Sequence, residues 1–181
     1  LPARFVLAVG SVEPRKGLGD LIRALALLDR DDLPLIHVGP QGWGDLDLGS
    51  MAETAGLAPD RVRALGFVDD AQLSAIMQAS TVFVMPSRAE GFGLPLLEAM
   101  SVGTPTIHTD VPALVEVAGG AGLVVELEPF AELPTRLADA ITAVVEDESY
   151  AEMLRVAGRD RARAFSWRDS AEKTWQLHAD L

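Results

Sequence analysis

The sequence predicts an α/β protein with a parallel sheet of about six strands and helices on both of its faces. Short, nearly continuous apolar runs alternate along the chain with segments whose apolar residues recur at helical spacing. Unbroken apolar runs are typical of parallel strands that are buried on both faces. The length of 181 residues, 49% of them hydrophobic, suits a domain with a sizeable core. We therefore expect residues 1–181 to form a single domain.

The expected strands are short apolar runs, most of which end at a glycine, a proline or a polar residue. They cover residues 5–10, 35–39, 62–68, 81–85, 104–108 and 122–127. Parallel sheets bind ligands in the crevice outside the carboxyl ends of their strands. The loops to search for a site are therefore those that follow Val9, Val38, Val68, Met85 and Ile107.

The expected helices connect these strands and form the last third of the chain. They cover residues 18–28, 45–55, 73–80, 94–101, 112–117, 133–145, 150–165 and 166–178. Leu18, Leu21, Ile22 and Leu25 illustrate the helical spacing of apolar residues in the first of them. Either Asp69 or Asp70 can cap the start of the third helix, since aspartate is favoured at that position.

Charge and composition exclude several classes of function. The formal net charge is −12, whereas duplex nucleic acid needs a basic face, so we expect no nucleic-acid partner. The chain has no cysteine, which excludes disulfides and thiolate chemistry. No apolar run reaches the roughly 20 residues that span a membrane. The first strand begins without a lead-in, so we expect the sequence to be a fragment of a longer chain.

The loop after the fourth expected strand, residues 86–100, is the most informative stretch. Pro95 suits the first turn of a helix, where its missing N–H is not needed. The N–H groups of residues 91–94 then lie at the helix start, where they and the helix dipole favour an anion. Gly91 and Gly93 let a ligand approach the backbone closely. These features predict a site for a diphosphate.

Two glutamates flank this helix start. Glu90 precedes the turn and Glu98 lies in the first turns of the helix, so both carboxylates are expected at one pocket mouth. Carboxylates accept hydrogen bonds from sugar hydroxyls, so one end of the loop could hold a sugar and the other a ribose. The alternative is a plain helix start, where glutamate is favourable in any case. That alternative leaves the two glycines and Phe92 between the glutamates unexplained.

The whole stretch resembles the glutamate-x7-glutamate signature of family 4 retaining glycosyltransferases, also called glycosyltransferase group 1. Further segments match the family in order along the chain, namely residues 9–17, 65–68, 86–87, 98–100, 103–105 and 165–167. The resemblance implies the GT-B fold, in which two Rossmann-like domains face each other. This chain would be the C-terminal, donor-binding domain, and the N-terminal acceptor domain would be absent from it.

The resemblance also implies roles for individual residues. Glu90 and Lys16 would be catalytic, with Glu90 positioning the transferred sugar and Lys16 neutralising the diphosphate. The family's arginine directly after the glycine is missing, because Ser11 stands there; Arg15 or Arg88 could substitute for it. Removing Glu90 is expected to spare the nucleoside diphosphate. The residues expected to bind the donor are Arg15, Val68, Ser87, Gly91, Phe92, Gly93, Leu94 and Glu98, the last of them through the ribose.

The implied reaction is sugar transfer with retained configuration and without a protein nucleophile. Lys16 and the helix start would stabilise the leaving diphosphate by fixed positive charge. The donor would be a UDP-, GDP- or ADP-sugar, and neither a cofactor nor a metal ion is expected. The full-length enzyme would be a hexosyltransferase, with mannosyl transfer among the candidates, in the synthesis of a cell-surface glycan, polysaccharide or glycolipid. The isolated domain is expected to be inactive.

Expectations for partners and location follow from the same resemblance. The acceptor would be a glycan, a lipid or a small molecule, and it would bind through the missing domain. We expect a cytoplasmic protein that could contact the inner face of the membrane through that domain.

Other functions remain open from the sequence. A GT-B sugar-nucleotide epimerase and a non-catalytic module that binds a sugar nucleotide are both compatible with these motifs. A phosphorylase would need a pyridoxal-binding lysine, and neither Lys16 nor Lys173 has such a setting. Asp45 and Asp47 form an Asp-x-Asp pattern that could bind metal, but an acidic helix start explains them more simply.

Overall fold

The computed structural model describes residues 1–28, 30–44 and 46–179. Its sheet has the strand order β3-β2-β1-β4-β5-β6, and all of the pairings are parallel. The strands are β1 (Val6–Val9), β2 (Leu35–Val38), β3 (Val62–Ala64), β4 (Val82–Met85), β5 (Thr106–Thr109) and β6 (Leu123–Val125). In the described residues this confirms the predicted parallel sheet of six strands.

The strand order reverses between β1 and β4. Residue Val6 of β1 pairs with Leu35 of β2 on one side and with Val82 of β4 on the other. The chain therefore leaves β1 toward one edge of the sheet and later leaves β4 toward the other edge. Such a reversal opens a crevice at the carboxyl ends of the two strands, which is where sheets of this kind bind ligands. The loops after Val9 and Met85 meet there.

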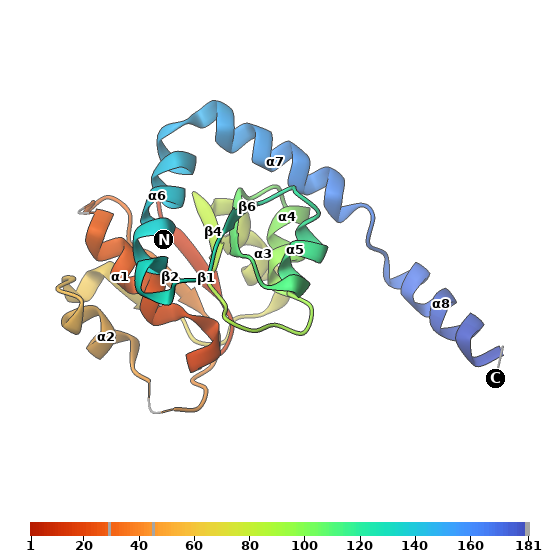
Figure 1. Ribbon diagram of the computed structural model, residues 1–181, viewed down its shortest axis with the longest axis horizontal. Helices are drawn as coiled ribbons and strands as arrows, with labels where there is room; N and C mark the ends of the chain where they lie inside the picture. The colour runs from red at the N-terminus through yellow and green to blue at the C-terminus, as the bar shows by residue number, and fades with distance from the viewer. Residues whose placement is uncertain (29, 45, 180–181) are drawn as a thin grey trace.

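Helices cover both faces of the sheet (Figure 1). They are α1 (Leu18–Leu28), α2 (Leu48–Thr54), α3 (Asp70–Ala79), α4 (Leu94–Ser101), α5 (Pro112–Ala118), α6 (Leu133–Glu146), α7 (Glu148–Ala162) and α8 (Trp167–Ala179). Short 3-10 turns lie at Pro14–Lys16, Pro59–Arg61 and Phe130–Glu132. Among the described helices, none combines the length and apolarity that a membrane crossing needs.

Two apolar cores lie on the two faces, because alternate residues of a strand point to opposite sides. Val6 and Ala8 of β1 pack with buried residues of α1, α2 and α6. Leu7, from the same strand, packs instead with buried residues of α3, α4 and α5. Helix α7 runs on past the sheet, and α8 projects away from the body of the domain (Figure 1).

Several expected elements are shorter than the sequence predicts, and the local cause is visible for two of them. The strand expected to reach Val68 ends at Ala64, because Gly66 takes a left-handed conformation with φ of 68°. The helix expected from residue 45 begins at Leu48, after Asp47, whose side chain accepts a hydrogen bond from the Ser50 amide. Asp45 lies outside the described residues. The carboxylate of Asp47 is therefore a helix cap, which accounts for it without a metal ion.

Candidate functional site

The loop after β1 packs directly against the loop after β4. Gly17 has a left-handed φ of 66°, and a Cβ atom added to it would lie only 2.0 Å from the Pro86 carbonyl oxygen. The Arg88 amide also donates a hydrogen bond of 2.7 Å to the Arg15 carbonyl oxygen. Gly17 is therefore needed for the close approach of the two loops, which brings residues far apart in the sequence into one site.

A buried aspartate fixes this junction. Asp20, in the first turn of α1, is 1% exposed, and its Oδ2 accepts hydrogen bonds from Arg88 Nη2 at 2.7 Å and Nε at 3.2 Å. Arg23 also pairs with Asp20, and the Arg88 guanidinium lies 4.8 Å from the centre of the Phe130 ring. Arg88 is thus occupied in holding the two loops together. Of the two arginines that the sequence offers as substitutes at Ser11, Arg15 is favoured because it lies beside Glu90, whereas Arg88 is paired with Asp20.

Glu90 is the centre of the polar contacts in the site. Its Oε1 accepts hydrogen bonds from Lys16 Nζ at 2.7 Å and from the Ser87 hydroxyl at 2.6 Å. Its Oε2 lies 3.4 Å from Arg15 Nη1, and Arg15 Nε in turn lies 2.8 Å from Glu13. The structure therefore brings together four of the predicted residues, Lys16, Arg15, Ser87 and Glu90, from two loops.

Ser87 is a support for Glu90. It is only 1% exposed, and its carbonyl oxygen accepts a hydrogen bond from the Thr109 hydroxyl at the end of β5. Its hydroxyl is turned toward the Glu90 carboxylate. A small, fixed side chain at this position holds the carboxylate at the carboxyl ends of β4 and β5.

The start of α4 has the geometry that an anion site needs. Gly93 caps the helix with a φ of 97°, and Pro95 lies in its first turn. The amides of Leu96 and Leu97 donate to the Gly93 carbonyl oxygen, whereas Leu94 lies in the first turn, where amides have no acceptor within the helix. A Cβ atom on Gly91 would point into open space, so its backbone is accessible. A Cβ atom on Gly93 would instead collide with Leu114, so this glycine serves packing as well.

Phe92 joins this loop to the connection between α7 and α8. Its ring meets Phe165 edge to face, with the ring centres 6.0 Å apart and the planes at 84°. The Arg161 guanidinium also lies over the Phe165 ring, 4.8 Å from its centre. The loop that carries the glycines is therefore supported by a residue more than 70 positions later in the sequence, 165 against 92.

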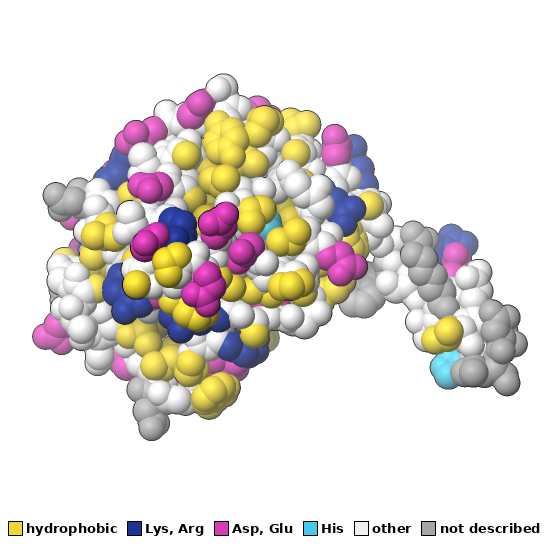
Figure 2. Space-filling view, viewed as in Figure 1, with side chains coloured by type: hydrophobic (Ala, Val, Ile, Leu, Met, Phe, Trp, Pro, Cys, Tyr) yellow, Lys and Arg dark blue, Asp and Glu magenta, His cyan; other side chains and the backbone are white. Residues whose placement is uncertain are grey.

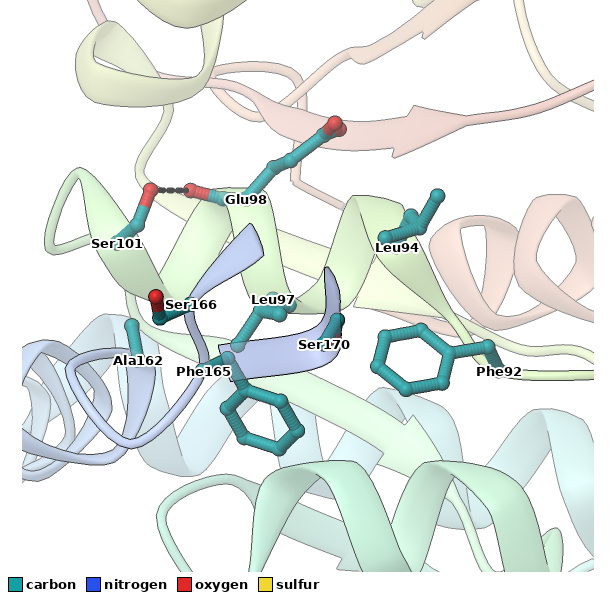
Figure 3. A pocket seen from close by; sticks show the side chains of 9 residues that line it. All are labelled: Phe92, Leu94, Leu97, Glu98, Ser101, Ala162, Phe165, Ser166 and Ser170. Carbon is teal, nitrogen blue, oxygen red and sulfur yellow. Dashed lines mark hydrogen bonds between the residues drawn. The ribbon is translucent and has the colours of Figure 1, made fainter. Parts of the chain in front are cut away.

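A cavity of about 240 Å³ opens beside this aromatic pair (Figure 3). It is lined by Phe92, Leu94, Leu97, Glu98, Ser101, Ala162, Phe165, Ser166 and Ser170. In Figure 3 the carboxylate of Glu98 points away from Phe165 and Ser166. Glu98 also lines a second cavity, between α3 and α4, together with Asp70 and Ser74.

The environment of Glu98 disfavours its charged form. Partial burial, followed by the negative charge of Asp70, raises the pKa of Glu98 above its usual value of 4.5. In the described residues, no positively charged group acts to lower the pKa of Glu98 again, whereas Glu90 is paired with Lys16. Glu98 is therefore a carboxylate that would gain from new hydrogen-bond donors.

The two glutamates lie on either side of the start of α4, and a shared pocket mouth stays a prediction. Glu90 contacts Lys16 and Ser87, which line a small space with Gly10 and Ser11, whereas Glu98 is among the residues that line the cavities beside α3 and beside Phe165. The glycine loop from Gly91 to Leu94 lies between the two ends.

Val68 lies just before the N-cap of α3 and is partly buried against the core. Its neighbour Phe67 is 85% exposed and lies at the edge of the sheet that β3 forms. Three features of the site were not predicted from the sequence: the buried Asp20, the position of Asp70 close to Glu98, and the contact of Phe165 with Phe92. Asp20 could have been found, because it is an acidic residue between the apolar Leu18 and Leu21 on the buried face of α1.

The fold and the site define the class of protein. The architecture is the Rossmann-like domain of GT-B glycosyltransferases. Residues 2–161 match the family described as glycosyl transferases group 1, and the chain belongs to this family.

Individual relatives support the same assignment. The chain is 36% identical over 173 residues to an Escherichia coli O-antigen chain mannosyltransferase B, covering 94% of this chain and 44% of the relative. It is 33% identical over 169 residues to a Mycobacterium leprae phosphatidyl-myo-inositol mannosyltransferase, covering 92% and 43%. The chain thus spans less than half the length of these two curated relatives.

Two solved structures have the same fold. A sucrose-phosphate synthase from Thermosynechococcus elongatus has a TM-score of 0.84 and 32% identity, with 99% of this chain and 46% of that chain covered. Anabaena HepE, solved in complex with UDP and glucose, has a TM-score of 0.86 and 25% identity, with 98% and 48% covered.

Proposed function

We propose that this chain binds a nucleoside-diphosphate sugar as the donor half of a retaining glycosyltransferase. The observation that carries the proposal is the meeting of Lys16, Arg15, Ser87 and Glu90 beside the start of α4, at the point where the strand order reverses. Cations, a fixed carboxylate and a helix start together suit a ligand that has a charged diphosphate and a hydroxyl-bearing sugar. The family membership favours transfer over the epimerase and the non-catalytic module.

Each residue has a distinct role in the proposal. Lys16 and the amides of the loop from Gly91 through Phe92 and Gly93 to Leu94 stabilise the charge that develops on the leaving diphosphate. Arg15 supplies the second cation, in place of the arginine that Ser11 replaces. Glu90 holds the transferred sugar.

The ribose and base lie at the other end of the loop. Glu98 accepts hydrogen bonds from the ribose hydroxyls, and the edge at Phe67 and Val68 receives the base. In this proposal the protein's own cations and the helix start balance the diphosphate charge, so that binding needs no divalent ion and no cofactor.

The relatives suggest a biological setting. Two of them are named mannosyltransferases, one for an O-antigen chain and one for phosphatidyl-myo-inositol. We propose that the longer protein transfers a hexose, with mannose the first candidate, to a glycan or lipid acceptor. The acceptor binds largely outside these 181 residues, because the chain spans under half of those relatives.

The proposal is tested by a calorimetric screen of the chain against UDP-glucose, GDP-mannose and ADP-glucose, with magnesium and with chelator. We expect saturable binding of one donor in both conditions. Binding of none of the three would contradict the donor site. Loss of binding in chelator would contradict metal independence and would draw attention back to the pair Asp45 and Asp47.

The chain alone is expected to bind the donor but to transfer no sugar. In this proposal the site supplies the groups that bind the diphosphate and the sugar, whereas the acceptor surface lies elsewhere. The measurement compares transfer by this chain and by a full-length family member to the same acceptor. Transfer by the chain at a similar rate would contradict this division of roles.

Donor affinity is expected to fall at acid pH because of Glu98. Protons and ribose hydroxyls compete for its carboxylate, so the affinity is highest above the raised pKa of Glu98 and weakens as pH falls through it. Asp70→Asn removes the like charge that helps to raise this pKa, so the loss should move to lower pH. The measurement is nucleoside diphosphate affinity between about pH 7 and about pH 4.

The diphosphate itself titrates in part of this range, but its contribution is common to all variants. Glu98→Ala should therefore show only that common dependence. If the affinity of Asp70→Asn depends on pH in the same way as that of wild type, the role proposed for Glu98 is wrong.

A further inference from the structure

Lys16, the cation proposed to bind the diphosphate, is already paired with a carboxylate of the protein. Lys16 Nζ lies 2.7 Å from Glu90 Oε1, and the side chains of the two residues are only 13% and 7% exposed. The Lys16 side chain runs against the backbone of Gly10, where an added Cβ atom would lie 3.4 Å from Lys16 Cε. The ammonium is therefore held in place by an internal carboxylate, with which a phosphate would have to compete.

Exchanging this carboxylate for a phosphate has a cost. Charge-assisted hydrogen bonds are stronger than neutral ones, and a partly buried pair is poorly screened by solvent. If Lys16 turns to a phosphate, Glu90 keeps only the Ser87 hydroxyl and the longer contact of 3.4 Å to Arg15. A poorly exposed carboxylate that loses a charged partner is destabilised unless another donor replaces it.

Only part of the expected ligand can replace that partner. The transferred sugar brings hydroxyl donors to Glu90, whereas a nucleoside diphosphate without its sugar brings none and adds negative charge near the carboxylate. The same residue should therefore favour the intact donor and disfavour the free diphosphate.

We propose that Glu90 is a specificity-determining residue that acts as a built-in competitor for Lys16. It selects intact sugar nucleotides over nucleoside diphosphates, and it thereby assists release of the nucleotide product. This inference rests on the proposed donor site. It differs from the expectation drawn from the sequence, in which removing Glu90 leaves the affinity for nucleoside diphosphate unchanged.

The test compares wild type with Glu90→Gln, which keeps the shape of the side chain but not its charge. Calorimetry is carried out with pyrophosphate, UDP, GDP and ADP, and with UDP-glucose, GDP-mannose and ADP-glucose. Glu90→Gln should bind pyrophosphate and the preferred nucleoside diphosphate about fivefold more tightly than wild type. It should bind the intact donor no better than wild type, so the preference for the intact donor over the diphosphate falls.

The matched control is Glu146→Gln. Glu146 ends α6 and pairs with Arg30 at 3.1 Å on the exposed surface, so this change removes the same formal charge away from the site. It should leave all affinities unchanged. Glu90→Ala, checked for folding by circular dichroism, should change the diphosphate affinity in the same direction as Glu90→Gln. In a Lys16→Ala background the gain from Glu90→Gln should shrink, because the competition is for Lys16.

The outcomes separate this inference from the proposed function. If wild type binds an intact donor but Glu90→Gln gains nothing for pyrophosphate or diphosphates, the competitor role is wrong and the donor site stands. An equal gain in Glu146→Gln would assign the effect to net charge and would also overturn the competitor role. If neither wild type nor Glu90→Gln binds any of the seven ligands, the donor site itself is wrong and the inference falls with it.

Discussion

Lys16→Ala is expected to weaken the binding of nucleoside diphosphate and sugar nucleotide by about tenfold to a hundredfold. The reason is that a charged hydrogen-bond partner of the diphosphate is lost, which costs on the order of 1.5–3 kcal/mol. The bare nucleoside should bind as it does to wild type, because it carries no phosphate. The measurement is a calorimetric series of nucleoside, nucleoside diphosphate and sugar nucleotide.

Salt and a control variant sharpen this prediction. The difference between wild type and Lys16→Ala should shrink as ionic strength rises, because it is electrostatic. Arg30→Ala removes a cation whose partners, Asp32 and Glu146, lie away from the site, and it should change none of the affinities. Equal weakening of nucleoside and nucleoside diphosphate in Lys16→Ala would contradict a phosphate partner for Lys16.

Glu98→Ala is expected to weaken nucleoside diphosphate and sugar nucleotide alike, again by about tenfold to a hundredfold. Both ligands carry the ribose, and the carboxylate is the proposed acceptor of its hydroxyls. The same titration series measures the effect. The ratio between the two ligands should therefore stay close to the wild-type value, in contrast to the variants of Glu90.

A ligand lacking the ribose hydroxyls gives the control. A dideoxy nucleoside diphosphate should bind wild type more weakly than the normal one, but should bind Glu98→Ala and wild type almost equally. This pattern shows that the residue and the hydroxyls act through one contact, as in a double-mutant cycle. If Glu98→Ala lowers the affinity for the dideoxy ligand as much as it lowers the affinity for the normal ligand, the ribose does not bind at Glu98.

The sequence predicted the fold because parallel strands and their covering helices leave local patterns. Leu18 to Leu28 was expected as a helix and is α1, and the expected cap at Asp69 or Asp70 is Asp69. The ends of the strands were harder to predict. Gly66 stops β3 through its backbone conformation, and the apolar pattern up to Val68 does not reveal that conformation.

The candidate site was predictable in its parts but not in its contacts. Spacing and glycines identified the loop from Glu90 to Glu98, and the structure has the predicted helix start there. The contact of Lys16 with Glu90 joins residues 74 positions apart, so it depends on the approach of two loops that only the folded chain creates. For the same reason the sequence could not tell that Arg88 is held by Asp20 whereas Arg15 lies beside Glu90.

The structure also shows where the charged side chains lie on the surface, which composition alone does not reveal. On the face shown in Figure 2, Lys and Arg side chains lie interspersed with Asp and Glu. That distribution agrees with the net charge of −12 and with a local rather than an extended phosphate site.

We propose that a sugar nucleotide binds across the loop between Glu90 and Glu98. Amide chemical-shift mapping of the isotope-labelled chain, titrated with the donor that the calorimetric screen selects, tests it most directly. We expect the largest shifts at the amides of residues 91–94, with further shifts at Lys16 and Glu98. Saturable binding whose shifts instead cluster elsewhere, for example along the groove between α1 and α6 lined by Leu27 and Thr135, would contradict it.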